Sequence, residues 1–229
     1  MFMRHGAPVA EHFASTQNDR SQVTLSDGSV VSLNWGSAID VTFSDTERRI
    51  MLRRGEAFFA VAKNPKRPFI VDAGDRRIAA LGTQFEVRLD RDRVEVVLLE
   101  GKVSVKDTGH NEQSSLLPNE RLVAVRGAAT LITQVNAQKQ TSWRQGWLEF
   151  ENDTLADAIA EFNRYSPQPI MLADPKVGAL RISGVFHLSP PQRFAALVQE
   201  LLPVKVDQDS EGRTQLRLAA TSVRPGRSE

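Results

Sequence analysis

The chain has 229 residues, of which 41% are hydrophobic and 25% are charged, and its 29 Lys and Arg residues nearly balance 28 acids. This composition is typical of a globular protein and excludes intrinsic disorder. The basic residues are scattered among acids, which disfavours a nucleic-acid-binding stripe. No window approaches the ~20 apolar residues that span a bilayer. Cysteine is absent, so disulfides and thiolate metal sites are excluded.

The first half of the chain is expected to be an all-β domain. Its apolar clusters are short and separated by turn residues, and no stretch has a sustained helical period. Ser26–Ser29 is expected to be a turn, Gly55 to break a strand, and Glu100–Gly101 to join a hairpin. A solenoid-like stack and a sandwich stack of short strands both fit this pattern. The expected strands cover residues 23–25, 31–35, 39–43, 50–52, 58–61, 69–71, 77–80, 83–89, 94–99 and 103–105.

The domain limits follow from composition. The stretch from Asn136 to Ser142 is polar and lacks a turn signal, so a boundary is expected there. The expected divisions are an unstructured leader at 1–15, the all-β domain at 16–128, a linker at 129–142, an α/β domain at 143–220 and a tail at 221–229.

The second domain is predicted to be a small α+β unit with the order β-α-β-β-α-β-β. Residues 147–150 form a short apolar strand, and Thr154 with Asp157 predicts a capping box at the start of a helix. A second helix is expected after Ser189-Pro190-Pro191-Gln192, with Ser189 as its cap. Its apolar face is expected to consist of Phe194, Leu197, Val198 and Leu201.

The sequence offers no constellation typical of catalysis, so no catalytic, cofactor-binding or metal-binding residue is assigned. The four histidines lack metal-ligand spacing. No phosphate-binding glycine loop or nucleophile elbow is present. An acid pair or Trp35, Trp143 or Trp147 could serve a carbohydrate-binding or glycan-active protein, and this class stays open as the alternative function.

Four segments, taken in order, resemble the FecR family: VTLSDGSVVSLNWGSAIDV (23–41), LRRGEAFFAVAKNPKRPFIV (52–71), LGTQFEVRL (81–89) and VEVVLLEGKVSV (94–105). The stretch from Trp143 to about Ala219, including ISGVF at 182–186, resembles the STN-type domain of secretins and TonB-dependent receptors, which follows in the same family.

The resemblance implies a binding protein and not an enzyme. Family members are sigma-factor regulators with a cytoplasmic anti-sigma segment, one transmembrane helix and a periplasmic region. The chain is similar to the periplasmic region, anchored to the inner membrane only through a transmembrane helix outside this sequence. The expected partners are the N-terminal signalling domain of a TonB-dependent outer-membrane transporter, commonly for siderophores, and an extracytoplasmic-function (ECF) sigma factor bound by the cytoplasmic segment.

The partner is expected to dock on a strand edge near Arg181–His187. Ser183, Val185 and His187 would face outward, while Ile182, Gly184 and Phe186 would face the helices. An exposed edge strand can accept an incoming strand through its backbone, with side chains supplying selectivity. The alternative docking surface is a helix face near Arg164.

Overall fold

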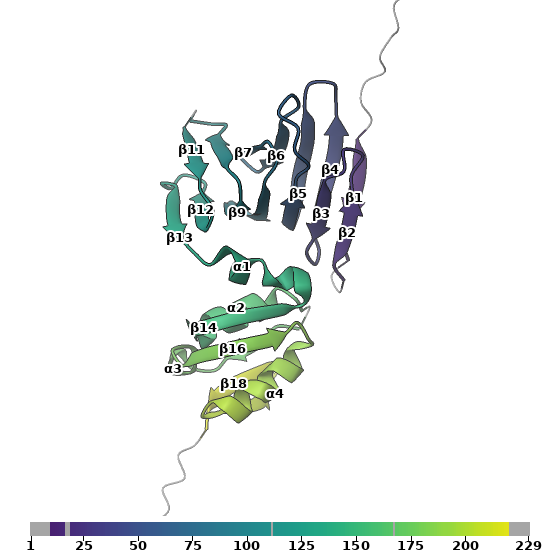
Figure 1. Cartoon of the computed structure of the whole chain (residues 1–229). Helices are drawn as coiled ribbons and strands as arrows, with labels where there is room; N and C mark the ends of the chain where they lie inside the picture. The colour runs from purple at the N-terminus through teal and green to yellow at the C-terminus, as the bar shows by residue number, and fades with distance from the viewer. Residues whose placement is uncertain (1–9, 17–18, 111, 167, 220–229) are drawn as a thin grey trace, which may run out of the picture. The chain divides into compact units, whose positions relative to one another are not determined.

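The computed structural model describes residues 10–16, 19–110, 112–166 and 168–219 (Figure 1). The chain divides into two compact units, unit 1 (Met1–Gly146) and unit 2 (Trp147–Glu229). It is strongly β-rich with few helices. The predicted tail at 221–229 lies outside the described residues.

Unit 1 consists of strands followed by two short helices. The strands are β1 (Glu11–Ala14), β2 (Ser21–Thr24), β3 (Val30–Leu33), β4 (Ala38–Phe43), β5 (Arg48–Ala60), β6 (Phe69–Ala73), β7 (Arg76–Ala80), β8 (Gln84–Asp90), β9 (Arg93–Glu100), β10 (Val103–Asp107), β11 (Gln113–Leu116), β12 (Glu120–Val125) and β13 (Leu131–Gln134). The helix α1 (Ala137–Gln140) and the 3-10 helix η1 (Ser142–Gln145) follow.

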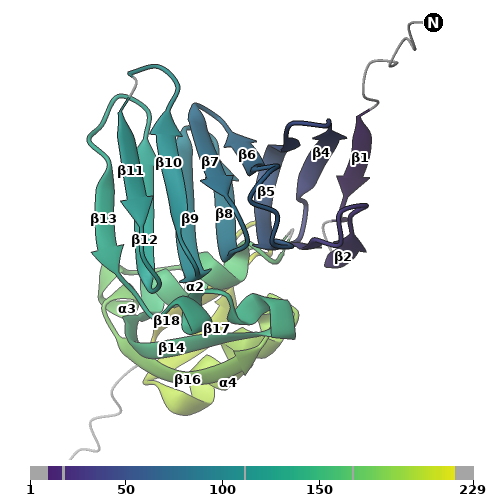
Figure 2. The ribbon, with the colours of Figure 1, turned by 45° about the horizontal axis from the view of Figure 1, so that its top comes forward.

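These strands form one curled sheet whose two arms share β5 (Figure 2). The first half of β5 pairs with β4 and, in parallel, with β6, and its second half pairs antiparallel with β3 and β8. Arm A continues through β6, β7, β10 and β11, with β1 outside β4. Arm B continues through β8, β9, β12 and β13, with β2 outside β3.

The inner faces of the two arms build the core of unit 1. Phe59 on arm B lies 5.8 Å from Phe69 on arm A and stacks at 5.2 Å on Phe85. Valine, isoleucine and leucine residues alternate along the same faces and are almost completely buried. The period-2 pattern seen in the sequence therefore reflects one buried face per strand.

A buried ion pair fastens the β2–β3 turn to the start of β5. Arg48 Nη1 lies 2.6 Å from Asp27 Oδ2, and the two side chains are 0% and 7% exposed. Arg48 also donates to the carbonyls of Arg67 and Ala62, each at 2.9 Å. Burial alone would raise the pKa of Asp27, but hydrogen bonds from Ser29 and Arg48 outweigh it and hold the pKa below its ordinary value.

Gly55 does not break a strand, contrary to the prediction, because β5 runs through it without interruption. Gly55 has φ +82°, and a Cβ there would lie 2.3 Å from Ser37 Oγ. A residue without a side chain is therefore required at the point where β5 passes from arm A to arm B.

The predicted hairpin at Glu100–Gly101 is also wrong. The turn joins β9 on arm B to β10 on arm A, and these strands pair with different neighbours. Gly101 has φ +89°, and a Cβ there would lie 2.7 Å from Thr83 Cγ2. A tight turn does form at these residues, as predicted, but it connects strands of different arms instead of two paired strands.

The ends of unit 1 also differ from expectation. Residues 11–14, predicted to be unstructured, form β1, which pairs with β4 and places Phe13 against the core. Residues 1–9 lie outside the described part. The predicted linker at 129–142 contains β13, which pairs with β12, and α1, so ordered structure replaces an open connection.

Unit 2 contains, in order, β14 (Trp147–Thr154), α2 (Leu155–Asn163), β15 (Met171–Leu172), α3 (Pro175–Gly178), β16 (Arg181–His187), α4 (Pro191–Leu201), β17 (Val204–Gln208) and β18 (Thr214–Leu218). The short helix α3 was not predicted. β14 and β16 pair antiparallel as a two-stranded sheet, and β15, β18 and β17 form a three-stranded sheet.

Aromatic residues join the helices of unit 2 to its two-stranded sheet. The rings of Phe162 on α2 and Phe194 on α4 stack with centroids 3.7 Å apart. Phe150 and Phe186 from β14 and β16 pack against Phe162 at 6.1 and 6.5 Å. Thr154 caps α2 as predicted, because its Oγ1 accepts from the Asp157 N–H at 3.1 Å. The return bond of a capping box is replaced by one between the side chains, in which the Thr154 hydroxyl donates to Asp157 Oδ2.

Two details of α4 were predicted incorrectly. The residue at its cap is Pro190, with no side-chain hydrogen bond, and Ser189 does not serve. Leu197 and Leu201 are 41% and 59% exposed, whereas Phe194 and Val198 are buried. The packed face of the helix is therefore rotated, with Ala195 in the place expected for a leucine.

Candidate partner-binding site

The two-stranded sheet of unit 2 buries one face and exposes the other. On β16, Ile182 and Phe186 are 3% and 7% exposed, whereas Val185 is 64% exposed. Ser183 and His187 are exposed as well. Gly184 is exposed, but its missing side chain leaves room for the Phe186 ring, which a Cβ would approach to 3.1 Å. The predicted alternation along this strand is therefore present.

A β-bulge in β14 fixes the beginning of β16. The register passes from Phe150 opposite Gly184 to Asp153 opposite Ile182, so Ser183 lies opposite the bulge. Asn152 within the bulge has φ +55° and donates its N–H to Ser183 Oγ at 2.8 Å. Arg181 Nη1 donates to the Asn152 carbonyl at 3.0 Å. Two of the predicted site residues thus already hold the bulge in place.

Val185 and His187 occupy the other half of the exposed face. Val185 stands opposite Glu149, and His187 stands opposite Trp147 with the two rings 6.3 Å apart and nearly perpendicular. Val185 is the exposed apolar side chain that the sequence singled out. A partner strand would find an apolar contact here with a carboxylate beside it.

Arg164 lies apart from this strand, directly after α2. Its Nη1 pairs with Glu161 Oε1 at 2.7 Å, and its side chain is 23% exposed. The guanidinium also lies 5.8 Å from the centre of the Tyr165 ring. The structure therefore does not bring Arg164 together with Arg181, Ser183, Val185 and His187, and its charge is engaged within its own helix turn.

Sequence reasoning missed a second organised surface, the outer face of arm B. Phe58 and Val97 are buried there although they lie outside the main core. The segment 137–145 covers them: Trp143 Nε1 donates to Glu86 Oε2 at 2.6 Å, and the Arg144 guanidinium lies 3.6 Å above the Phe58 ring. Burial lowers the pKa of Arg144, partly opposed by Glu86.

The exposure of the three tryptophans bears on the alternative function of carbohydrate binding. Trp143 is 1% exposed, so its ring cannot stack on a sugar. Trp35 and Trp147 are half-buried. Strand pairing brings Ser32, Phe58, Glu86 and Val97 into one row across arm B. Two apolar side chains and a carboxylate in this row require a cover, and this requirement is the signal that could have placed Trp143 in unit 1.

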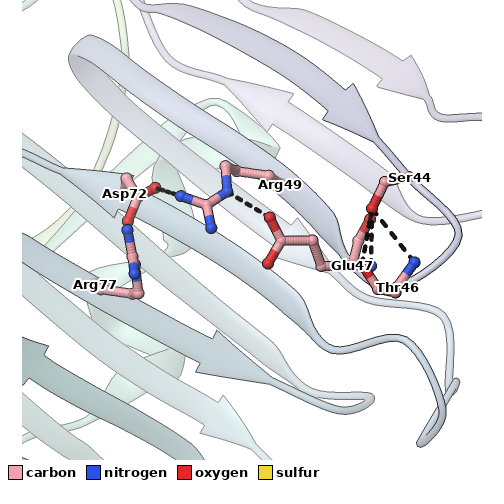
Figure 3. A network of polar contacts seen from close by, with 6 residues as sticks. All are labelled: Ser44, Thr46, Glu47, Arg49, Asp72 and Arg77. Atoms are coloured by element: carbon pink, nitrogen blue, oxygen red, sulfur yellow. Dashed lines mark hydrogen bonds and ion pairs between the residues drawn. The ribbon is translucent and has the colours of Figure 1, made fainter. Parts of the chain in front are cut away.

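The outer face of arm A carries a ladder of charges (Figure 3). Asp72 receives Arg49 Nη1 at 2.9 Å and Arg77 Nε at 2.7 Å. Arg49 Nε also contacts Glu47 at 2.8 Å, and this hydrogen bond lowers the pKa of Glu47. The Ser44 hydroxyl accepts the N–H groups of Thr46 and Glu47 in the adjoining turn. Within this ladder two carboxylates, Glu47 and Asp72, balance two guanidinium groups, Arg49 and Arg77.

The described residues form neither a metal-binding cluster nor a membrane-spanning helix. No group of three or more His, Asp or Glu side chains there is arranged to hold a metal ion. No helix in that part of the chain combines the length and apolarity required to cross a membrane.

Comparison with known proteins places the fold. Residues 12–104, which make up most of unit 1, match the family described as FecR protein. Two crystal structures of a "putative anti-sigma factor" from Parabacteroides distasonis ATCC 8503 resemble it over both units. Both are 28% identical to this chain and are covered over 100% of their own length. The first has a TM-score of 0.74 and covers 93% of this chain, and the second has a TM-score of 0.75 and covers 92%. No curated protein matches the chain.

Proposed function

We propose that the chain is the signal-receiving region of a sigma-factor regulator, and that unit 2 is an STN-like module that binds the N-terminal signalling domain of a TonB-dependent outer-membrane transporter. The transporter would be one for siderophores, and the region would lie in the periplasm. A cytoplasmic segment and a transmembrane helix outside this sequence would connect it to an ECF sigma factor.

The observation that carries the proposal is the exposed β16 strand in unit 2, in a chain whose unit 1 matches the FecR family. A sheet of two strands has an outer edge on each strand, and unpaired backbone groups at an edge can pair with another chain. Val185, 64% exposed on β16, adds an apolar contact for an incoming side chain. The likeness to a protein described as an anti-sigma factor supports the regulatory half of the proposal.

The experiment uses the full chain and the signalling domain of the transporter encoded beside its gene. A partner that binds only the folded protein stabilises it by about 2.7 kcal/mol at a hundredfold excess over Kd. This stabilisation raises the melting temperature. We expect such a shift with that domain and none with the signalling domain of a transporter that another regulator serves. Equal behaviour of the two domains would contradict the receiver role.

A reporter gene under the cognate ECF sigma factor tests the second half. In cells carrying the full-length regulator, the transporter's ligand should induce the reporter. Deletion of unit 2 should abolish the response to ligand. A ligand response that persists without unit 2 would assign reception to another part of the regulator.

A further inference from the structure

We propose that unit 1 contains a binding site for small carboxylates on the outer face of arm B. A pocket of about 260 Å³ opens there between residues 19–22 and Ser32 on one side and Trp143 and Arg144 on the other. All of these residues belong to unit 1. The site is independent of the transporter partner proposed above.

Strand pairing and the segment after β13 build the pocket. Gln22 and Ser32 are direct partners on β2 and β3, and Ser32 is in turn opposite Phe58 on β5. Trp143 and Arg144 cover Phe58 and Glu86. Arg20 closes the pocket from the other side by donating Nη1 to the Trp143 carbonyl. The buried Trp143 therefore holds one wall of the pocket in place.

The pocket brings together two guanidinium groups that form no close ion pair in the described part of the chain, although Glu86 attracts Arg144 from farther away. Within the described part of the chain, neither Arg20 nor Arg144 has a carboxylate oxygen within the 4.0 Å of an ion pair, in contrast to Arg48, Arg49 and Arg76. The contacts of Arg144 Nε and Nη2 are to Thr141. Since burial lowers the pKa of Arg144, a bound anion would offset the cost of its desolvation.

The remaining residues select a carboxylate. Guanidinium N–H groups form a planar fork that matches a carboxylate with two parallel hydrogen bonds. The Gln22 amide and Ser32 hydroxyl add neutral donors and acceptors. Asp19 lines the same pocket, with Oδ1 accepting the Arg20 N–H at 2.8 Å. Its charge disfavours the two charges that a phosphate dianion concentrates on one group, whereas succinate spreads two charges over separate carboxylates. The volume admits several waters, so a small molecule suits it.

Titration of the full chain with acetate, succinate and inorganic phosphate at constant ionic strength tests the site, followed by ¹H–¹⁵N NMR. We expect saturable shifts with acetate and succinate at residues 19–22, at Ser32 and at the Trp143 indole, and weaker shifts with phosphate. Stronger binding of phosphate would overturn the carboxylate assignment. Absence of saturable shifts with all three anions at about 50 mM, a concentration well above a 1 mM Kd, would overturn the site itself.

Variants separate the pocket from general charge effects. Arg20→Gln should weaken succinate binding at least about tenfold, equivalent to the loss of one strong charge-assisted hydrogen bond. Gln22→Glu, on an exposed strand position, should do the same without altering the fold. Arg126→Gln removes one charge from a residue 67% exposed in another turn and should bind normally. Equal affinity of the wild type and both pocket variants would refute the proposal.

Discussion

Trp143 Nε1 donates a 2.6 Å hydrogen bond to Glu86 Oε2 across 57 positions of sequence, and the Trp143 ring and the Glu86 side chain are both buried. This bond makes the segment after β13 part of the folded structure of unit 1. The end of unit 1 at Gly146 is therefore set by tertiary contacts that the polar composition of residues 136–142 did not reveal.

The first prediction concerns this end of unit 1. A fragment covering residues 10–146 should unfold cooperatively, because it retains β13 and the Trp143 anchor. A fragment ending at Ala128 should expose Phe58 and Val97 and melt much lower or fail to fold. Circular dichroism melting of the two fragments measures the difference. Equal melting temperatures would show that the segment 129–146 only connects.

The second prediction concerns the buried Asp27–Arg48 pair. Asp27→Asn should cost about 3 to 5 kcal/mol at pH 7, since Arg48 is 0% exposed and would lose its charged partner. Glu47→Gln, in a partly exposed pair with Arg49, should cost no more than about 1 kcal/mol. Urea unfolding of both variants checks the contrast.

The same pair has a pH signature. The folded pKa of Asp27 lies below its ordinary value near 3.8, so its stabilising contribution is complete above that value. The contribution is lost as the pH falls from about 3.8 through the folded pKa. The stability difference between wild type and Asp27→Asn should therefore shrink in acid. A difference that stays constant from pH 7 to pH 2.5 would contradict the ionic nature of the contact.

The third prediction separates the two glycines with similar backbone angles. Gly28 and Gly55 have φ +83° and +82°, but a Cβ at Gly28 meets open space whereas at Gly55 it would meet Ser37 Oγ at 2.3 Å. Gly28→Ala should cost about 1 kcal/mol through backbone strain alone. Gly55→Ala should cost at least about 1 to 3 kcal/mol more, because β4 and β5 must move apart. Thermal melting of the Gly28→Ala and Gly55→Ala variants measures the difference. Similar losses of stability would show that the contact between Gly55 and Ser37 does not matter.

The fourth prediction concerns the core of unit 2. Phe162→Ala should cost about 3 to 5 kcal/mol, because Phe162 stacks on Phe194 and is 1% exposed. Leu197→Ala should change stability by less than about 1 kcal/mol, because Leu197 is 41% exposed. Protease resistance of unit 2 in the full chain reports both. Similar losses of stability in the two variants would show that Leu197 lies on the packed face of α4, as expected from the sequence.

The sequence predicted features that local chemistry determines. The turn at Asp27–Gly28 joins β2 to β3, Thr154 caps α2, and residues on β16 alternate between buried and exposed. Each depends on neighbours within a few positions, such as turn residues, a cap or a period of two. The candidate residues on β16 could be found in this way because exposure along a strand follows its alternation.

The failures arose where distant residues decide the structure. Gly55 could be recognised as special, but only pairing with four strands shows that β5 continues through it. The orientation of α4 depends on the stacking of Phe162 on Phe194, and the helix period allowed Leu197 as readily. The pocket beside Arg20 requires Trp143 to return to arm B, which no local signal predicts.

The most direct test of the account is the affinity of the full chain for the transporter signalling domain, measured by calorimetry for wild type and variants at β16. Val185→Lys replaces an apolar contact by a charge and can pair with Glu149, so the fold should persist. Ser183→Pro removes both the hydroxyl and the backbone donor, and Ser183→Ala removes only the hydroxyl that accepts from Asn152.

We predict that Val185→Lys and Ser183→Pro weaken binding at least about tenfold, a loss of 1.4 kcal/mol or more, with Ser183→Ala and Arg164→Glu close to wild type. Melting temperatures measured beside the affinities guard against unfolding. Normal binding by Val185→Lys and Ser183→Pro, together with loss of binding by Arg164→Glu, would contradict docking on β16 and place the partner on the helix face.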